Sequence, residues 1–384
     1  MNKFSEALRR YRGQPSFTGL MLFLSVVILN IVIQGVSTCT TGGYTFGNFF
    51  AFFSPTSLNT IIMTNLPFIL VTIGQAILLI VGQMDISIGI QIALVNVVCI
   101  MVPQELGTSV WVGFLAGIGA AIAISLVAGF ACSVLRLPAL LASYALTYAI
   151  KGINVLIMPT AQGSIPKAFW KPYQSTIYKL FDKDAVAQLS AFAQKLLGIL
   201  NYIPVSVFVL VIVLVSWRLI VRTRFGKHIY AVGSNPRNAF AAGISPVGTQ
   251  MKAFLIKGVY TGIAGICLTL MTASGNPLQC EEYGIRSLSA AIIGGLGWGG
   301  WGSVACGVFG GGFLVIIQNT VYYFFTLLSK LFEGFAVSSY WQNLVSDIII
   351  FGGLLMTIVT AKAQRETLKQ GLKQQFKRGE KYVK

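Results

Sequence analysis

Long apolar runs separated by short polar segments dominate the hydropathy pattern of this 384-residue chain. Most of the runs reach the roughly 17–25 residues that a helix needs to cross a bilayer. In lipid, backbone polar groups must bond within the protein, so runs of this length predict transmembrane α-helices. They cover residues 18–37, 59–82, 87–103, 109–135, 139–158, 203–222, 252–273, 287–297, 303–326 and 341–361. The pattern predicts an all-α polytopic membrane protein with about ten transmembrane helices, within a range of eight to ten.

Basic residues gather beside the apolar runs and indicate the orientation. They cluster in the first 17 residues, between Arg218 and Lys252, and in the last 23 residues. Cytoplasmic segments of membrane proteins carry an excess of Lys and Arg. The predicted organisation is therefore a cytoplasmic N-terminus (1–17), a membrane domain (18–361) with an external segment (159–201) and a cytoplasmic loop (223–250), and a basic cytoplasmic tail (362–384). The run 18–37 is longer than a signal-peptide core and is interpreted as a retained first helix.

Composition supports the membrane class. The chain is 55% hydrophobic and only 10% charged, whereas soluble domains carry about 25% charged residues. A net charge of +17 would suggest nucleic acid in a soluble protein, but basic clusters beside apolar spans favour the membrane interpretation and attract anionic lipids. The six cysteines have no metal-ligand spacing, so no metal site and no cofactor are expected. Cys39 and Cys280 both fall on the predicted outer side, and a disulfide between them is possible.

The external segment contains an apolar periodicity of helical type. Val186, Leu189, Phe192, Leu196 and Leu197 recur at helical spacing within 185–200. This pattern predicts either an amphipathic helix on the outer membrane surface or a lid packed on the bundle.

The cytoplasmic loop encodes a short capped helix. Asn235 followed by Pro236 is typical of an N-cap with proline at the first helical position. Good helix formers follow, and Gly243 suits a left-handed C-terminal cap. Such a helix could dock into a separate ATPase or serve as an ordinary connector, and the residues alone favour neither.

Two glycine-flanked interruptions lie in the two halves of the chain. In the first, Asp85 stands between Gly82 and Gly89 within apolar sequence. A buried Asp costs about 2.5–3.5 kcal/mol at a helix centre, so it should face a cavity, a partner or an interface. Asp85 could line a translocation path or cap the following helix, and the second role is slightly favoured. The second interruption is the short, glycine-rich run 287–302. Paired interruptions are expected of an inverted-repeat transporter with its path at the repeat interface.

Small and polar residues define two further candidate sets. Residues spaced by four predict one helix face for close packing: Gly295, Gly299, Ser303, Gly307 and Gly311. Polar residues within or beside the apolar runs are the candidates for lining a translocation path: Gln75, Gln83, Asp85, Ser87, Asn96, Ser287, Ser289 and Asn319. Lys257 lies near the predicted cytoplasmic end, from which a lysine side chain could reach water.

Catalytic motifs are missing from the sequence. No Gly-Lys-Ser/Thr phosphate loop is present, and the single histidine, His228, lies in the basic loop. The chain is therefore expected to be a transporter rather than an enzyme, with any ATP hydrolysis on a partner chain.

Three motifs resemble the ribose/xylose/galactoside-type ABC permeases of the branched-chain amino acid/ribose permease superfamily. They are Arg224-Phe-Gly with Ala231-Val-Gly-Ser-Asn-Pro and Ala239-Phe-Ala-Ala-Gly, then Gly82-Gln-Met-Asp-Ile-Ser-Ile-Gly, then Ala290-Ala-Ile-Ile-Gly-Gly. The resemblance spans residues 59–361. It departs at Ile285-Arg286-Ser287, where the family often has Glu-Leu-Asp, and at Ser143-Tyr144-Ala145, where Thr-Leu-Gly is usual.

The resemblance implies a permease subunit of an ATP-driven importer in a bacterial inner membrane, with both termini cytoplasmic. Its partners would be an ABC ATPase, an extracytoplasmic sugar-binding protein and a second permease, either identical or related. The substrate would be a small sugar, with nucleosides or another small polar solute as the alternative. The residues expected to contact the ATPase are Ser234, Asn235, Pro236, Arg237, Asn238, Ala239, Ala242 and Gly243.

Two other classes remain open on the residues alone. Polar residues within the spans, such as Gln318 and Asp347, are compatible with a secondary transporter driven by an ion gradient. A membrane channel or scaffold is the third class. Only the ABC permease should require a separate ATPase.

Overall fold

The computed structural model describes residues 14–180, 197–297, 299–331, 344–345, 347–349 and 351–352. Within these ranges the chain is helical, and its only β-type contacts are isolated bridges between Gln162 and Gly275 and between Thr176 and Pro204. The long helices are α2 (Pro15–Gly42), α4 (Pro55–Ile80), α5 (Ile88–Leu106), α6 (Val110–Gly129), α7 (Ala139–Ile157), α11 (Ser206–Arg222), α14 (Pro246–Thr272) and α16 (Val304–Leu331). The short ones are α3 (Phe46–Phe49), η1 (Ala51–Phe53), η2 (Phe130–Val134), α8 (Lys167–Tyr173), η3 (Ile177–Leu180), η4 (Leu200–Tyr202), α12 (Arg224–Ser234), α13 (Pro236–Ala241) and α15 (Tyr283–Ile293).

Seven of the described helices are long and apolar enough to cross a membrane, and the bent pair α11–α12, with 79° between its parts, would be an eighth. This confirms the all-α polytopic class. The predicted stretch 87–103 forms the 19-residue α5, whereas 287–297 overlaps α15, whose 11 residues rise only about 16 Å and cannot span a core of about 30 Å. The stretch 341–361 lies mostly outside the described residues.

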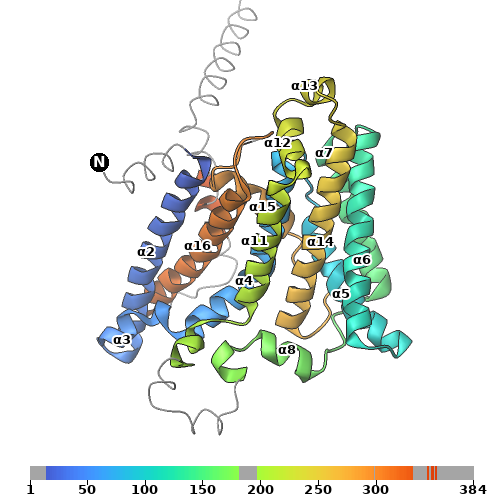
Figure 1. The fold of residues 1–384 in the computed structure, drawn as a ribbon. Coiled ribbons are helices and arrows are strands. Elements are labelled where there is room, and N and C mark those ends of the chain that lie inside the picture. Colours follow the sequence, from blue (N-terminus) through green and yellow to red (C-terminus); the bar gives the residue numbers. More distant parts are fainter. Residues whose placement is uncertain are drawn as a thin grey trace, which may run out of the picture.

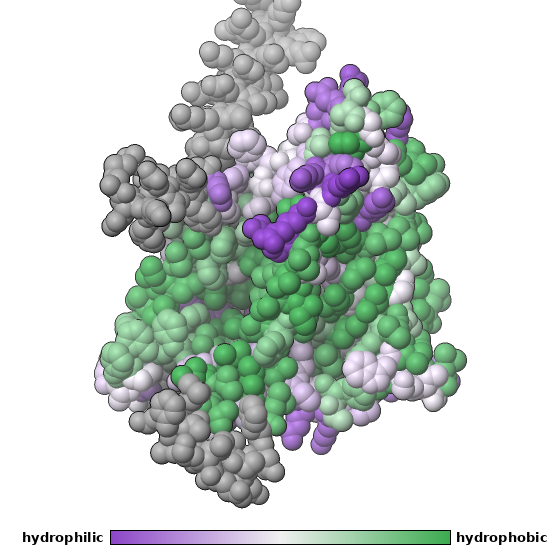
Figure 2. Space-filling view, viewed as in Figure 1, coloured by the Kyte–Doolittle hydropathy of each residue, from purple (hydrophilic) through white to green (hydrophobic). Residues whose placement is uncertain are grey.

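The bundle has two polar ends with an apolar belt between them (Figure 2). The start of α2, helices α12 and α13, and the start of α14 lie at one end, called the α13 end here (Figure 1). Helices α3 and α8 lie at the opposite end, called the α8 end. The predicted cytoplasmic elements among the described residues therefore share one end.

Helix α14 forms the centre of the core and packs against α4, α5 and α6. Two of its glycines allow the closest approach, because a Cβ at Gly262 would lie 2.9 Å from Ile118 Cα and one at Gly258 3.0 Å from Ile122 Cα. Small residues at such crossings let backbones pack tightly where no hydrophobic force drives association. A second layer pairs α16 with α2 along their length (Figure 1).

The prediction that five residues spaced by four share one helix face is wrong for the first three of them. Gly295, Gly299 and Ser303 lie in the irregular connection between α15 and α16, and only Gly307 and Gly311 stand on α16. Gly295 and Gly299 have φ of +95° and +70°, which a helix excludes. Gly307 does pack as expected, because its Cβ would lie 3.0 Å from Ala76 of α4.

Two further predictions concern the predicted outer side. Cys39 and Cys280 are both free thiols, so the possible disulfide is not formed. Cys280 lies in the connection between α14 and α15, whereas Cys39 is on α2. The external segment 159–201 contributes α8 and the turns η3 and η4, but most of the predicted amphipathic helix 185–200 lies outside the described residues.

Candidate functional site

The chain between α4 and α5 is broken by a tight turn. Gly82 has a φ of +81°, and the Gln83 amide donates to the Leu78 carbonyl at 2.8 Å, which ends α4. Asp85 then accepts hydrogen bonds from the Ser87 amide at 2.9 Å and from the Ser87 hydroxyl at 2.5 Å. Asp85 therefore accepts a hydrogen bond from a backbone amide just ahead of α5. This is close to the predicted capping role, but the N-cap position of α5 is occupied by Ser87.

A buried lysine neutralises this aspartate. Lys257 Nζ of α14 lies 2.5 Å from Asp85 Oδ2, and both side chains are fully inaccessible. The expectation that Lys257 reaches water at the cytoplasmic end is wrong. Its side chain turns inward because Asp85 supplies the opposite charge that a lysine needs in a medium without water.

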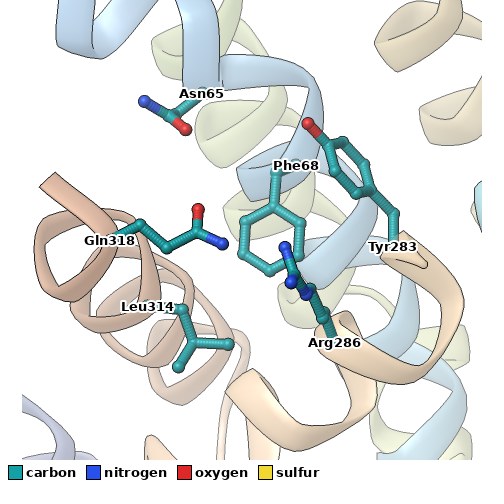
Figure 3. Close-up of a pocket in the computed structure, with 6 residues that line it drawn as sticks. All are labelled: Asn65, Phe68, Tyr283, Arg286, Leu314 and Gln318. Atoms are coloured by element: carbon teal, nitrogen blue, oxygen red, sulfur yellow. The ribbon is translucent and has the colours of Figure 1, made fainter. Parts of the chain in front are cut away.

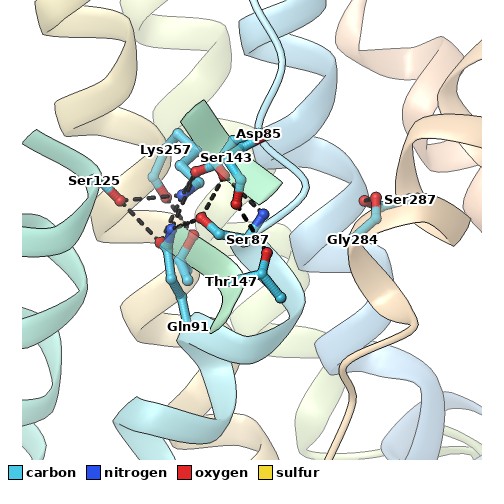
Figure 4. A network of polar contacts seen from close by, with 10 residues as sticks. Asp85, Ser87, Gln91, Ser125, Ser143, Thr147, Lys257, Gly284 and Ser287 are labelled. Atoms are coloured by element: carbon cyan, nitrogen blue, oxygen red, sulfur yellow. Dashed lines mark hydrogen bonds and ion pairs between the residues drawn. The ribbon is translucent and has the colours of Figure 1, made fainter. Parts of the chain in front are cut away.

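Two neutral side chains complete the network around the ion pair (Figure 4). Lys257 Nζ also donates to Gln91 Oε1 at 2.6 Å and to Ser125 Oγ at 3.2 Å. Gln91 Nε2 donates to Asp85 Oδ2 at 3.1 Å and to Ser87 Oγ at 2.7 Å. All five residues are 0% exposed. The network joins the α4–α5 break to α6 and α14, and its satisfied polar groups hold one geometry.

The start of α15, just before the second interruption, meets the first interruption in space. A Cβ on Gly284, at the start of α15, would collide with the Ile86 carbonyl, and one on Gly89 would lie 2.8 Å from the Gly284 amide. Asn96 of α5 also ties down the α14–α15 connection, since it donates to Ser274 O at 3.1 Å and accepts from the Asn276 amide at 2.8 Å. The first interruption and α5 therefore contact the segment 274–284, which directly precedes the second predicted interruption at 287–302.

The remaining path candidates are dispersed. Ser287 is buried and donates to Gly284 O at 2.9 Å, and Ser289 is also buried. Gln75 is 0% exposed, and its amide has no partner among the described residues. Asn319 lies 3.4 Å from both Asn30 and Gln34 of α2. These side chains do not gather into one site with Asp85 and Ser87.

Gln83 alone of these candidates lines a groove. This open groove of about 880 Å³ lies at the α13 end, between the α4–α5 break, the start of α7 and α13. Arg136 and Arg237 contribute to its wall, and neither makes an ion pair within the described part of the chain. The groove therefore presents unpaired positive charge beside the break.

The predicted short helix is present as α13. Asn235 Oδ1 accepts from the Arg237 and Asn238 amides at 3.0 and 3.1 Å, and Gly243 has a φ of +80°. Ser234, Arg237, Asn238 and Ala242 are exposed, whereas Ala239 is buried. The cap, the proline start and the glycine end are thus confirmed, and the helix presents an exposed polar surface at the end of the bundle. The preceding helix α12, capped by Thr223 at 3.3 Å, was not foreseen.

A smaller cavity lies between α4, α15 and α16 (Figure 3). Its volume of about 20 Å³ suits a single water molecule. Gln318 and Arg286 point into it (Figure 3). Arg286 also lies 3.1 Å from Asp347 and 3.4 Å from Glu282. No cluster of three or more His, Cys, Asp or Glu suited to a metal occurs among the described residues.

Sequence reasoning missed Gln91 and Ser125 as members of the network around Asp85 and Lys257. Both interrupt apolar runs, and Gln91 follows Asp85 by six residues. That polar pattern was the available signal, but only the packing of α6 and α14 on α5 shows which groups meet.

Comparison with known proteins identifies the family. Residues 57–357 match the model of the branched-chain amino acid transport system / permease component family. The chain belongs to this family. The matched span covers both interruptions, α13 and the Asp85–Lys257 pair.

Individual relatives align with this chain along most of their length. The L-arabinose transport system permease protein AraH of Escherichia coli (strain K12) is 27% identical over 77% of this chain and 80% of the relative. The ribose import permease protein RbsC of the same strain is 25% identical over 92% of this chain and 98% of the relative. The inner membrane ABC transporter permease protein YjfF is 25% identical over 85% and 89%. No solved structure gives a significant match. The protein is thus a multi-pass membrane permease subunit of ABC-importer type and not an enzyme.

Proposed function

We propose that this permease imports a small sugar across a bacterial inner membrane, driven by ATP hydrolysis on a partner chain. The carrying observation is the family match, which extends over α13 and both interruptions. Among its relatives, RbsC and AraH are named for ribose and L-arabinose, which supports a monosaccharide substrate delivered by an extracytoplasmic binding protein.

The α13 end is proposed to face the cytoplasm and to receive the ATPase. The capped helix α13 exposes Arg237 and Asn238 at this end, and the cap keeps the short helix rigid enough to move as a body. Phe240, which is 71% exposed, provides an apolar contact of the kind that anchors an interface. Cysteines introduced at Arg237 or Asn238 should cross-link to the ATPase in the assembled complex.

A second permease is proposed to cover the outer face of α7. Lys151 of this helix pairs with Glu281 at 2.7 Å, and their side chains are 35% and 40% exposed. Glu281 adjoins the break, because a Cβ on Gly89 would lie 2.9 Å from its carbonyl. Half-exposed charges at this depth are unfavourable in hydrocarbon. A protein neighbour or a water-filled seam on this face removes that cost, which supports a dimer with the sugar path beside α7.

Reconstitution tests the function directly. The permease, its ATPase and its binding protein are placed in proteoliposomes, and uptake of labelled ribose, L-arabinose and galactose is measured with and without ATP. Uptake should require all three components. Accumulation of solute by the permease alone on an ion gradient would overturn the proposal and favour a secondary transporter.

A further inference from the structure

A glycine-rich loop holds the end of α4 just before the break. This loop, residues 294–303, connects α15 to α16 and is called the glycine loop here. The Gly299 amide donates to the Leu79 carbonyl at 3.1 Å, and the Gly300 amide donates to the Ile80 carbonyl at 2.7 Å. The last turn of a helix lacks donors for its own carbonyls. The glycine loop therefore supplies them two residues ahead of Gly82, where the break begins.

The same loop lies against the backbone of α12. A Cβ on Gly300 would lie 2.7 Å from the Ser234 amide and 3.0 Å from the Tyr230 carbonyl. A Cβ on Gly233 would lie 2.7 Å from the Gly300 amide and would overlap the Ile80 carbonyl. Real Cβ atoms do not approach this closely, so the three backbones meet with no side chain between them.

Helices α12 and α13 are joined by a single residue, so the connection between them is short. Asn235 ends α12 and also caps α13 through its side chain. Ile229 and Val232 of α12 are fully buried against the core. A displacement of α13 must therefore pass into α12, and Gly233 is the penultimate residue of α12.

We propose that Gly233, Gly300 and the last turn of α4 form a backbone joint that transmits movement of α13 to the α4–α5 break. Contact between backbones has no rotamer freedom to absorb a displacement, and packed interiors transmit strain. Helix α13 also continues through Ser245 into α14, whose Lys257 holds Asp85. Two routes from α13, one through the joint and one through α14, thus converge on the same break.

The joint rests on the proposed function, in which the ATPase moves α13. Gly233 and Gly300 are positioning residues in this scheme, because they act by passing movement from α12 to the end of α4. The readout that separates this role from a structural one is the ratio of sugar transported to ATP hydrolysed. Damage to assembly lowers both quantities together, whereas damage to the joint lowers transport alone.

The first test is Gly233→Ala in the complete reconstituted transporter. Transport per ATP should fall roughly tenfold or more, since displacements of about 1 Å in a working assembly cost large factors in rate. ATP hydrolysis stimulated by the binding protein should stay close to that of the control. The matched control is Gly119→Ala on α6, where a Cβ meets nothing within 4 Å.

The second test is Gly300→Ala, which adds both a clash and backbone strain at a φ of +74°. Gly107→Ala is its control, because Gly107 has a φ of +59° and open space around it. Gly300→Ala should uncouple transport from hydrolysis, and Gly107→Ala should not. Equal ratios in the two variants would assign any loss to strain alone and overturn the joint.

A third variant perturbs the joint after assembly. Trp301→Cys, 67% exposed in the glycine loop and outside the predicted ATPase contacts, is modified with a methanethiosulfonate reagent in the folded complex and restored with a reducing agent. The coupling ratio should drop and then recover, while Lys252→Cys, exposed at the same end, should be insensitive. This variant decides the matter if Gly233→Ala does not assemble.

The possible outcomes separate the two proposals. Normal coupling in the glycine variants and in modified Trp301→Cys overturns the joint and leaves the proposed function intact. Hydrolysis that falls in step with transport also overturns the joint, because the glycines then serve assembly. A wild-type complex without ATP-dependent uptake overturns the proposed function itself.

Discussion

Lys257 of α14 lies 2.5 Å from Asp85 in the α4–α5 break, and water reaches neither side chain. The pair bridges 172 positions of sequence, and Asp85 adjoins Ile86, whose carbonyl meets Gly284 at the start of α15. Its burial makes the charges interdependent: each is tolerated only because the other is present.

Removing one charge should therefore destabilise the protein more than removing both. Asp85→Asn or Lys257→Met alone should cost about 3–5 kcal/mol, because an uncompensated charge remains buried. The double variant should recover most of that loss. Thermal unfolding of the purified subunit in nanodiscs ranks the stabilities of the single and double variants. Lys252→Met is the control, since Lys252 is exposed at the α13 end and makes no ion pair among the described residues. Equal losses in single and double variants would contradict the interpretation.

Contact between the first interruption and the start of α15 should make Gly284 intolerant of a side chain. Gly284→Ala forces a methyl group against the Ile86 carbonyl, and overpacking of this kind costs about 1–3 kcal/mol or more. Gly152→Ala, on α7 with open space around it, should instead stabilise its helix by up to about 1 kcal/mol. The two variants should shift the unfolding temperature in opposite directions. Similar shifts would show that these segments do not pack as described.

The cap of α13 should contribute to coupling. Asn235→Ala removes the acceptor for two amides and should cost about 1 kcal/mol of helix stability. Cross-linking of Arg237→Cys to the ATPase should weaken accordingly. Asn235→Asp keeps a capping oxygen and should restore the yield of cross-linked product. If Asn235→Ala cross-links as well as the parent, the rigidity of α13 is not needed for docking.

The outer face of α7 should be accessible to water. Tyr144 and Tyr148 are 54% and 53% exposed, and their hydroxyls lie 3.1 Å apart. If this face borders a sugar path, Tyr144→Cys and Tyr148→Cys should react with a water-soluble maleimide in a Cys280→Ser background. Ile212→Cys on α11 is 64% exposed and is expected to face lipid, so it should not react. Protection of the tyrosine positions by substrate would link the face to transport, whereas unreactive cysteines would exclude a water-filled seam.

Orientation can be tested with exposed phenylalanines at the two ends. Phe240 on α13 and Phe46 on α3 are 71% and 83% exposed. An impermeant maleimide added to intact cells should label Phe46→Cys, and Phe240→Cys should be labelled only after the membrane is opened. The reverse pattern would place the α13 end outside and contradict both ATPase docking and the positive-inside interpretation.

Sequence signals predicted those elements well whose ends are set by interactions within a few residues. Asn235, Pro236 and Gly243 define α13 through a side-chain cap, a fixed φ and a left-handed end, and each acts within a few residues. Asp85 was correctly recognised as an anomaly that needs a partner. The spacing-by-four prediction failed at Gly295 and Gly299 because periodicity does not reveal positive φ, which there serves contacts with distant backbones.

The amino-acid sequence by itself determined the class of the protein, since apolar runs of spanning length have few stable solutions other than membrane helices. It also determined the capped helix of the α13 end and the expectation that Asp85 faces a cavity, a partner or an interface. Only the tertiary structure decided that Lys257 neutralises Asp85, that Gly284 meets Ile86, and that Gly300 binds the end of α4. These contacts join residues far apart in the chain, and they arise because helix packing brings their backbones together, which no local pattern encodes.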